Sequence, residues 1–272
     1  MRIAVLADIH GNLEAFEACL ARVDELDVDL TVIAGDLLNG APDSLACWQL
    51  ARDRGFPVLR GNHERYLFDL GTPAEDPLWR TERFGPVRWA AARFDRRQLE
   101  EMRRLPLCWR PEGAPELLVV HASARNDTDH IHPHTPAALV DEAFGQANAR
   151  LIVRAHNHMP SVRHWRHSLI ISAGSVGMPL DGTTTAKMLL LERDAGGEWR
   201  YEHVAVPYDV SAALQRFRES GYLEEAGAMS RMILREIATG AHQMTPFIRY
   251  WEQEAPEVSS LEEAVERFLA AY

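Results

Sequence analysis

Two histidines one residue apart, His156 and His158, follow a short apolar run in the stretch LIVRAHNHMP (151–160). Imidazole nitrogens can bind transition metal ions or exchange protons near neutral pH, so the pair could do chemistry. The chain has 12 histidines, and a pair could also fall here by chance. The positions of the other polar residues distinguish these two interpretations.

Polar side chains of similar types follow the other apolar runs. Five runs end in ADIHGN, AGDLLNG, RGNHER, VVHAS and RAHNHMP. They supply carboxylate, amide and imidazole groups from Asp8, His10, Asp36, Asn62, His63, His121, His156 and His158. Ligand sites in open α/β sheets form at the carboxyl ends of the strands. The two histidines are therefore predicted to belong to one shared site.

The donor types indicate which ions such a site would hold. Without His63, the set offers seven nitrogen and oxygen donors and no thiolate. This chemistry suits two divalent ions, Mn²⁺ first, with Fe, Zn²⁺, Ni²⁺ or Mg²⁺ as alternatives. Two ions about 3.5–4 Å apart can stabilise the attacking and leaving oxygens of a phosphoryl transfer. Each motif alone is common in structural turns, but all five in order favour a metal site.

The elements that must position these residues alternate between strand and helix. Short apolar runs predict strands at 2–7, 30–34, 57–59, 116–120, 150–155 and 169–173. A helix capped by Asn12 and others at 43–55 and 136–148 lie between them. The Ala-Gly-Gly at 195–197 predicts a hairpin. This alternation favours an α/β fold with parallel strands and crossover helices.

The chain is expected to have a main domain at 1–208 and a helical extension at 209–272. Within the main domain, 64–110 reads as a mostly helical, arginine-rich insert. The extension is expected to hold helices near 210–220, 222–239, 246–254 and 260–271, and its function is open. It could support a homodimer or cover the site.

The ordered motifs resemble those of the calcineurin-like metallophosphoesterase superfamily. They read DIH, GD, GNHE, a lone histidine and AHNH, and the resemblance runs from Met1 to about Tyr208. DIHGNLEAF and GSVGMPLDG look most like the bacterial and archaeal small-phosphodiesterase branch. Two departures are Ala155, where glycine is usual, and SAGS (172–175), where Asn-Pro-Gly-Ser is frequent. The resemblance implies a four-layer αββα sandwich of two mixed β-sheets flanked by helices.

The same resemblance implies roles for the strand-end residues. It assigns Asp8, His10 and His158 to one ion, Asn62, His121 and His156 to the other, and Asp36 to both. A hydroxide held between the ions would attack phosphorus in line. His63 would then protonate the leaving oxygen or stabilise its charge.

Candidate substrate contacts lie outside this set. Arginine binds phosphate in a bidentate manner, so Arg93, Arg96 or Arg97 of the insert could meet an anionic substrate. The alternative is a solvated helix face. In DHIHPHT (129–135), His130 and His132 could also contact substrate, and the alternative is an exposed loop beside the site.

Composition limits the partners that the protein is expected to bind and the compartment in which it is expected to occur. The net charge of −11 disfavours binding to nucleic acid or to an anionic membrane. No apolar run is long enough to span a bilayer, and the first residues do not resemble a signal peptide. Three widely spaced cysteines fit reduced thiols, so we expect a cytoplasmic protein.

These observations predict a dinuclear metal-dependent phosphoric ester hydrolase. Its substrate would be a small, nucleotide-like phosphate ester, as a phosphodiester or a monoester. A nuclease is one alternative, although the acidic charge and the lack of interleaved aromatic and basic residues count against it. A non-catalytic metal-binding scaffold of the same fold is another. A scaffold would be expected to have lost ligands or His63, and this chain retains all eight positions.

Overall fold

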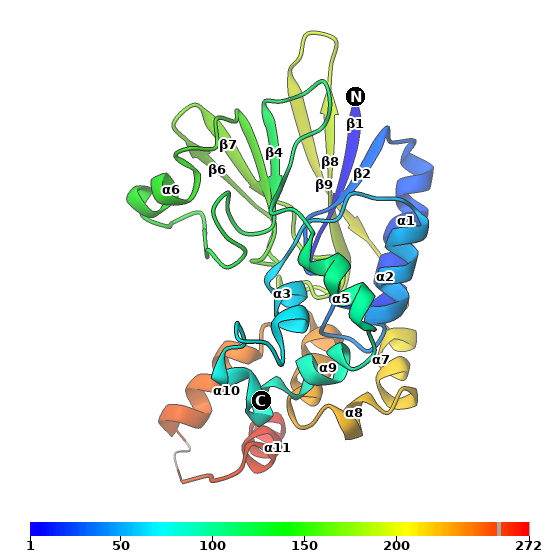
Figure 1. Ribbon diagram of the computed structural model, residues 1–272, viewed down its shortest axis with the longest axis vertical. Helices are drawn as coiled ribbons and strands as arrows, with labels where there is room; N and C mark the ends of the chain where they lie inside the picture. The colour runs from blue at the N-terminus through cyan, green and yellow to red at the C-terminus, as the bar shows by residue number, and fades with distance from the viewer. Residues whose placement is uncertain (255–256, 272) are drawn as a thin grey trace.

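Two mixed β-sheets form the centre of the protein (Figure 1). The structure is a computed structural model that describes residues 1–254 and 257–271. The first sheet has the order β2-β1-β8-β9, with β1 (Arg2–Leu6), β2 (Leu30–Ile33), β8 (Ala186–Arg193) and β9 (Trp199–Val206). The second has the order β3-β4-β5-β7-β6, with β3 (Cys108–Trp109), β4 (Leu117–Val120), β5 (Leu151–Arg154), β6 (Ser161–Trp165) and β7 (Ser168–Ser172).

The sheets pack face to face because their strands carry apolar side chains on both faces. In β1, Ile3 and Val5 join the core between the sheets, together with Val119 of β4 and Val153 of β5. Leu6 instead belongs to the core on the outer face of the first sheet. A strand buried on both faces needs a layer on each side, which produces the sandwich.

Helices cover the outer faces of both sheets. On the first sheet, α1 (Leu13–Leu26) and α2 (Ser44–Asp53) bury residues such as Phe16 and Trp48. On the second sheet, α6 (Ala137–Phe144) buries Val140 and Phe144. The Asn12 side chain accepts a hydrogen bond from the Ala15 amide and caps α1 as predicted. The four-layer αββα sandwich expected from the sequence is confirmed.

The remaining helices gather at one end of the sandwich (Figure 1). The insert supplies α3 (Asn62–Asp69), the 3₁₀ turns η1 (Pro77–Arg80) and η2 (Glu82–Phe84), α4 (Gly85–Ala91) and α5 (Arg96–Arg103). After β9 come α7 (Val210–Glu219), α8 (Tyr222–Glu225), α9 (Met229–Thr239), α10 (Met244–Arg249), the π-helix η3 (Tyr250–Glu254) and α11 (Leu261–Ala271). Helix α9 packs against α4 and α7, so the insert and the C-terminal helices share a core.

Several sequence predictions differ from the observed elements. The run at 57–59 makes one parallel bridge, Val58 to Ile33, rather than a strand, and β3 and β6 were not expected. The helix predicted at 222–239 is broken into α8 and α9 at Gly227, whose φ of 79° is left-handed. The division at residue 208 stays a prediction. Of the predicted extension, 255, 256 and 272 lie outside the described residues.

Three contacts anchor the C-terminal helices to loops of the sandwich. The Tyr222 hydroxyl donates to the Gly40 carbonyl in the loop after β2. Arg216 of α7 pairs with Asp43 at the start of α2. The Gly182 amide donates to the Gly240 carbonyl at the end of α9, 2.9 Å away. These helices are therefore fixed beside the loops that follow the strands.

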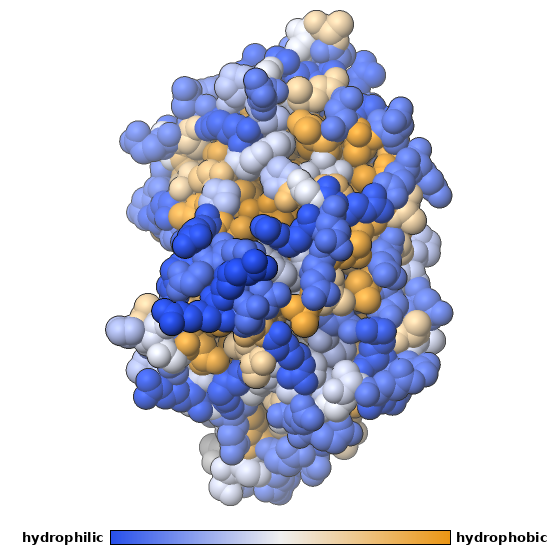
Figure 2. All heavy atoms as spheres, turned by 45° about the vertical axis from the view of Figure 1, so that its right-hand side comes forward, coloured by the Kyte–Doolittle hydropathy of each residue, from blue (hydrophilic) through white to orange (hydrophobic). Residues whose placement is uncertain are grey.

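Hydrophilic residues predominate on the face shown in Figure 2. In the part of the chain that the structure describes, no helix is both long enough and apolar enough to cross a membrane. All three cysteines are free thiols, and burial raises the pKa of Cys19 to about 12. That thiol is a packing residue rather than a nucleophile.

We expect Tyr222→Phe to lower the free energy of unfolding by about 1–2 kcal/mol, because the buried Gly40 carbonyl loses its donor. Urea unfolding of the variant measures the change. Tyr201→Phe is the matched control, since Tyr201 is 43 % exposed on β9 and its removal should change nothing. Equal stability of the two variants would show that the contact does not anchor α8.

Candidate metal centre

The first group of side chains at the strand ends comprises Asp8, His10 and His158. Asp8 and His10 follow β1, and His158 follows β5. Their ligand atoms all lie within 4.8 Å of one another. His10 Nε2 is 3.1 Å from His158 Nε2, and His158 Nε2 is 3.8 Å from an Asp8 carboxylate oxygen. Three donors from two distant segments therefore meet at one point.

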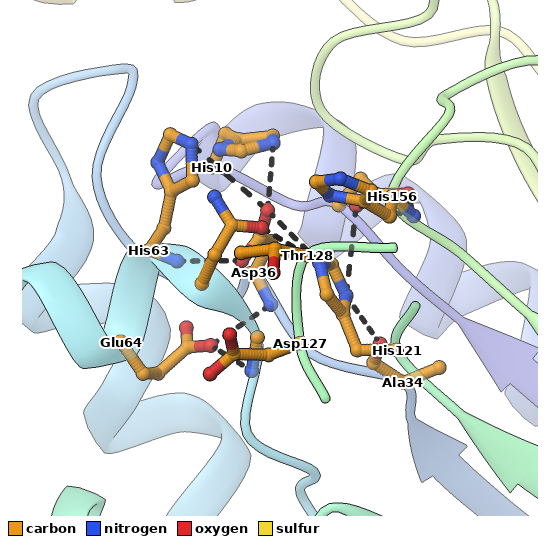
Figure 3. Close-up of polar contacts among 12 residues, drawn as sticks. His10, Ala34, Asp36, His63, Glu64, His121, Asp127, Thr128 and His156 are labelled. Atoms are coloured by element: carbon orange, nitrogen blue, oxygen red, sulfur yellow. Dashed lines mark hydrogen bonds and ion pairs between the residues drawn. The ribbon is translucent and has the colours of Figure 1, made fainter. Parts of the chain in front are cut away.

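A second group comprises Asp36, His121 and His156, whose ligand atoms also lie within 4.8 Å. His121 Nε2 is 3.4 Å from Asp36 Oδ2 and 3.0 Å from the side-chain oxygen of Asn62. Asp36 Oδ2 is also 3.8 Å from His10 Nε2 of the first group. Figure 3 shows the histidine rings arranged around Asp36. The carboxylate of Asp36 thus belongs to the second group and also lies next to the first.

Backbone carbonyls fix the orientation of three imidazoles. The Nδ1 atoms of His10, His121 and His158 lie 2.8, 2.9 and 2.7 Å from the carbonyls of Asn39, Ala34 and Met178. A carbonyl only accepts hydrogen bonds, so each Nδ1 carries the hydrogen. In the neutral ring, Nε2 then presents its lone pair.

This arrangement fits a bound cation. Since their Nδ1 atoms face backbone carbonyls, the Nε2 atoms of His10 and His158 point at each other at 3.1 Å, an arrangement that a cation bound to both nitrogens would stabilise. His156 Nε2 is buried and has no hydrogen-bond partner among the described residues. A divalent cation satisfies such nitrogen and carboxylate donors, and the lack of thiolates fits Mn²⁺, Fe or Zn²⁺.

The backbone at these positions adopts an uncommon conformation. The φ angles are positive at Asp8 (51°), His10 (51°), Asp36 (50°), His156 (71°) and His158 (60°). Each such residue costs on the order of 1–3 kcal/mol and persists only where the surroundings determine it. Here the His10 amide donates to the Asp36 carbonyl at 2.9 Å, and the Asp8 amide donates to Gly35 at 3.1 Å. Five strained residues in one place mark a functional site.

Burial and mutual charge set the protonation of the group. Burial lowers the pKa of His156 to about 2 and holds the pKa of His10 well below its usual value, so both rings are neutral. Burial also raises the pKa of Asp8 to about 6. Burial lowers the pKa of His121 as well, but the Asp36 carboxylate outweighs it and raises that pKa to about 9. Burial opposes ionisation of Asp36, yet His121 and His63 hold its pKa well below the usual range.

Glu64 is a functional residue whose role the sequence did not reveal. Its fully buried carboxylate accepts hydrogen bonds from the amides of Asp36 (2.9 Å), Gly61 (2.8 Å) and Leu38 (3.2 Å). Burial, followed by the charge of Asp36, raises the pKa of Glu64 to about 7. The available signal was its place three residues after the cap of α3, typical of a capping box. Glu64 joins the loop after β2 to the start of α3.

Asn39 is a second residue that the sequence analysis missed. Its backbone carbonyl lies 2.8 Å from His10 Nδ1 and 3.0 Å from His63 Nδ1. Its side-chain amide lies 2.8 Å from His63 Nδ1. Asn39 therefore orients a candidate ligand and the candidate proton donor together. The Asn-Gly pair at 39–40 predicts a turn, but no sequence signal indicates these contacts.

A cavity of about 660 Å³ opens beside the two groups. Its lining includes His10, His63, His156 and His158. His130 and His132 line it as well, and the His130 ring centroid is 4.5 Å from that of His156. The loop that carries these two exposed histidines thus reaches the candidate site.

The predicted arginines lie elsewhere. Arg93 covers the Trp89 ring and is 3.3 Å from Glu225, while Arg96 and Arg97 lie on α5. The side chain of Arg97 is 83 % exposed. None of the three is among the described residues that line the cavity, whereas Arg83 is.

Arg154 holds the histidine-bearing loop in place. Its buried guanidinium donates to the carbonyls of Ala122 (2.9 Å), Ile131 (2.9 Å) and Asp129 (3.0 Å). Burial lowers the pKa of Arg154 to about 10. Three hydrogen bonds from one rigid group fix the loop from 122 to 131 against the end of β5.

Comparison with known proteins now defines the family. Residues 1–196 match the calcineurin-like phosphoesterase superfamily domain. The chain belongs to this superfamily. The match spans both sheets except β9 and includes all eight strand-end positions. The resemblance inferred from the motifs is confirmed, and with it membership of a metal-dependent phosphoesterase family.

Relatives and solved structures occur in bacteria and archaea. An uncharacterized protein of Methanocaldococcus jannaschii is 26 % identical over 231 residues, which cover 79 % of this chain and 90 % of the relative. A symmetrical bis(5′-nucleosyl)-tetraphosphatase of Chromohalobacter salexigens is 28 % identical over 165 residues, 59 % of each chain. A metallophosphoesterase structure from Sphaerobacter thermophilus aligns with a TM-score of 0.70 and 23 % identity, covering 89 % of this chain and 99 % of that one. That structural likeness supports the fold.

We expect Glu64→Ala to lower the free energy of unfolding by about 3 kcal/mol or more, because three buried amides lose their acceptor. Glu64→Gln retains one oxygen and should lose less. Urea unfolding measures both variants. The control is Glu202→Ala, since Glu202 is exposed on β9. If Glu64→Ala unfolds like the control, Glu64 does not organise the centre.

Proposed function

We propose that this protein is a dinuclear metal-dependent phosphoesterase that hydrolyses a small, nucleotide-like phosphate ester. The observation that carries the proposal is the position of the Asp36 carboxylate between His10 of the first group and His121 of the second, beside a cavity. Membership of the superfamily supports metal-dependent phosphoester hydrolysis. The relative that acts on bis(5′-nucleosyl) tetraphosphates, as its name states, supports the nucleotide-like class.

The residues divide into two ligand sets and one further histidine. Asp8, His10 and His158 would hold one ion, Asn62, His121 and His156 the other, and Asp36 both. Divalent ions, Mn²⁺ by preference, would supply Lewis-acid activation of water and charge stabilisation at the phosphoryl group. The protein's own contribution is orientation, because backbone carbonyls fix the rings of His10, His121 and His158.

His63 is the candidate proton donor to the leaving oxygen. Asn39 holds its Nδ1, and its Nε2 is 4.0 Å from Asp36 Oδ2. The side chain is 28 % exposed and lines the cavity, so it can reach a bound ester. Burial lowers the pKa of His63, although Asp36 opposes the shift. A lowered pKa makes the charged ring a better proton donor to the leaving group.

The alternatives have less support. A nuclease needs a positively charged path for a nucleic-acid backbone. Arg83 is the one arginine or lysine among the described cavity-lining residues, and the net charge of the chain is −11. A non-catalytic scaffold would not require His63 to be oriented by Asn39 next to the donors.

We expect His63→Ala to lose at least about 100-fold in turnover while still binding metal, because a general acid contributes roughly 10²–10⁴-fold. The assay is hydrolysis of p-nitrophenyl phosphate and bis(p-nitrophenyl) phosphate by metal-stripped protein, before and after addition of Mn²⁺. Comparison of the two esters also determines whether monoesters or diesters are preferred.

His134→Ala is the matched control. His134 is exposed in the same histidine-rich loop as His130 and is not among the described lining residues. Its loss should leave turnover unchanged. Metal analysis of both variants separates a lost proton donor from a lost ligand. Unchanged turnover in His63→Ala would remove its assigned role, and absence of Mn²⁺-dependent turnover in the unmodified protein would contradict the proposed function.

A further inference from the structure

The cavity beside the candidate metal centre has two unlike walls. One wall carries the strand-end histidines. The opposite wall comes from η2, α4 and the C-terminal helices, which pack against one another through α4 and α9. Its apolar residues are Phe84, Val87, Met229, Ile233, Met244 and Ile248. The C-terminal helices α9 and α10 contribute four of these six residues, and the sequence left the function of these helices open.

This apolar wall is held in a fixed position. The Gly182–Gly240 backbone hydrogen bond ties the end of α9 to the sandwich. The buried carboxylate of Glu236 accepts from the amides of Gln243 (2.7 Å) and Met244 (2.9 Å), which positions the start of α10. A wall fixed in this way can select between ligands, because it does not rearrange to fit each one.

Charge around the cavity limits how many phosphates a ligand can carry. Arg83 is the single arginine or lysine among the described lining residues, and it is 4.0 Å from Glu252. Glu236 adds a carboxylate to the lining. Beyond the strand-end residues, the described lining adds the imidazoles of His130, His132 and His242 but no second guanidinium or ammonium group, so further phosphates would meet little fixed cationic charge. The cavity therefore disfavours a polyphosphate chain.

The side-chain types favour an aromatic group over a purely aliphatic one. Four methionines line the cavity, Met159, Met178, Met229 and Met244, together with the rings of Tyr66 and Phe84. Methionine sulfur makes favourable contacts with aromatic rings, and ring–ring contacts add to the burial of apolar area. A volume of about 660 Å³ accommodates a nucleoside-sized group with its phosphate.

We infer that the site takes esters with a single phosphoryl group whose organic part carries an uncharged aromatic group such as a nucleobase. The phosphoryl group lies at the strand-end donors, and the aromatic group lies against the wall built by η2, α4, α9 and α10. The inference rests on the proposed function for the placement of the phosphoryl group. It assigns a substrate-selecting role to the C-terminal helices.

The test compares three phosphonates that lack a hydrolysable ester bond: methylphosphonate, cyclohexylphosphonate and phenylphosphonate. Their dissociation constants are measured by calorimetry on the full chain reconstituted with Mn²⁺. We expect phenylphosphonate to bind about tenfold more tightly than methylphosphonate, because the ring buries apolar area against the wall. Cyclohexylphosphonate should bind between the two, because it lacks the aromatic contacts.

Two variants each introduce a polar side chain into the apolar wall of the cavity. Met244→Gln keeps the side-chain volume, and Ile248→Asn adds an amide on α10; both residues are partly buried. Each should reduce the preference for phenylphosphonate about fivefold without changing methylphosphonate binding, as expected when a buried apolar contact is lost. Leu139→Asn is the matched control, since Leu139 is 46 % exposed on α6 and is not among the described lining residues. Thermal unfolding confirms that each variant is folded.

The outcomes separate this inference from the proposed function. Equal affinity for phenylphosphonate and methylphosphonate, or no binding of any of the three, would overturn the inference. Tighter binding of cyclohexylphosphonate would overturn the aromatic assignment. Hydrolysis of p-nitrophenyl esters is measured in parallel. Hydrolysis without a phenyl preference removes only the inference, and a phenyl preference without hydrolysis removes only the proposed catalysis.

Discussion

Backbone hydrogen bonds between the loops after β1 and β2 are the constraint on which the rest of the site depends. The His10 amide donates to the Asp36 carbonyl, and the Gly11 amide donates to the Leu37 carbonyl. These bonds hold both loops in left-handed conformations that the chain would otherwise avoid. The sandwich supplies the rigid strands from which the loops emerge. Because the loops are fixed, Asp8, His10 and Asp36 point to one place.

Buried charge is the second constraint, and it acts against stability. Asp8 and Asp36 are both almost completely buried, and Glu64 is buried next to Asp36. Carboxylates taken out of water are costly unless cations or hydrogen-bond donors compensate them. Backbone amides compensate Glu64, and the His156 amide lies 3.1 Å from an Asp8 oxygen. His121, whose pKa is raised to about 9 by Asp36, offsets part of this carboxylate charge. The neutral rings of His10 and His156 add none, and divalent cations would complete the compensation for Asp8 and Asp36. The same burial that strains the folded protein thus favours metal binding.

The sequence predicted the strand-end residues well because their positions follow local rules. A short apolar run ends at a polar residue, and parallel strands bring their carboxyl ends to one edge, so Asp8, His121 and His156 could be placed together. Asn39 and Glu64 could not be assigned roles, because their contacts join segments more than 20 residues apart. The short strand β6 was missed, since its pairing with β7 carries no strong apolar pattern. The apolar wall of the cavity was also missed, because it depends on how α9 packs against α4, and these helices are far apart in the sequence. Composition indicated arginines in the insert, but not that Arg83, rather than Arg93, reaches the cavity.

The central claim is that the strand-end residues hold two divalent ions with Asp36 between them. The most direct measurement is equilibrium dialysis of metal-stripped protein against Mn²⁺, with the bound ion counted per chain. The account predicts two ions for the unmodified protein and loss of affinity at both sites in Asp36→Ala, with folding verified by circular dichroism. Binding of one ion or none by the unmodified protein, or retention of two tightly bound ions by the variant, would contradict it.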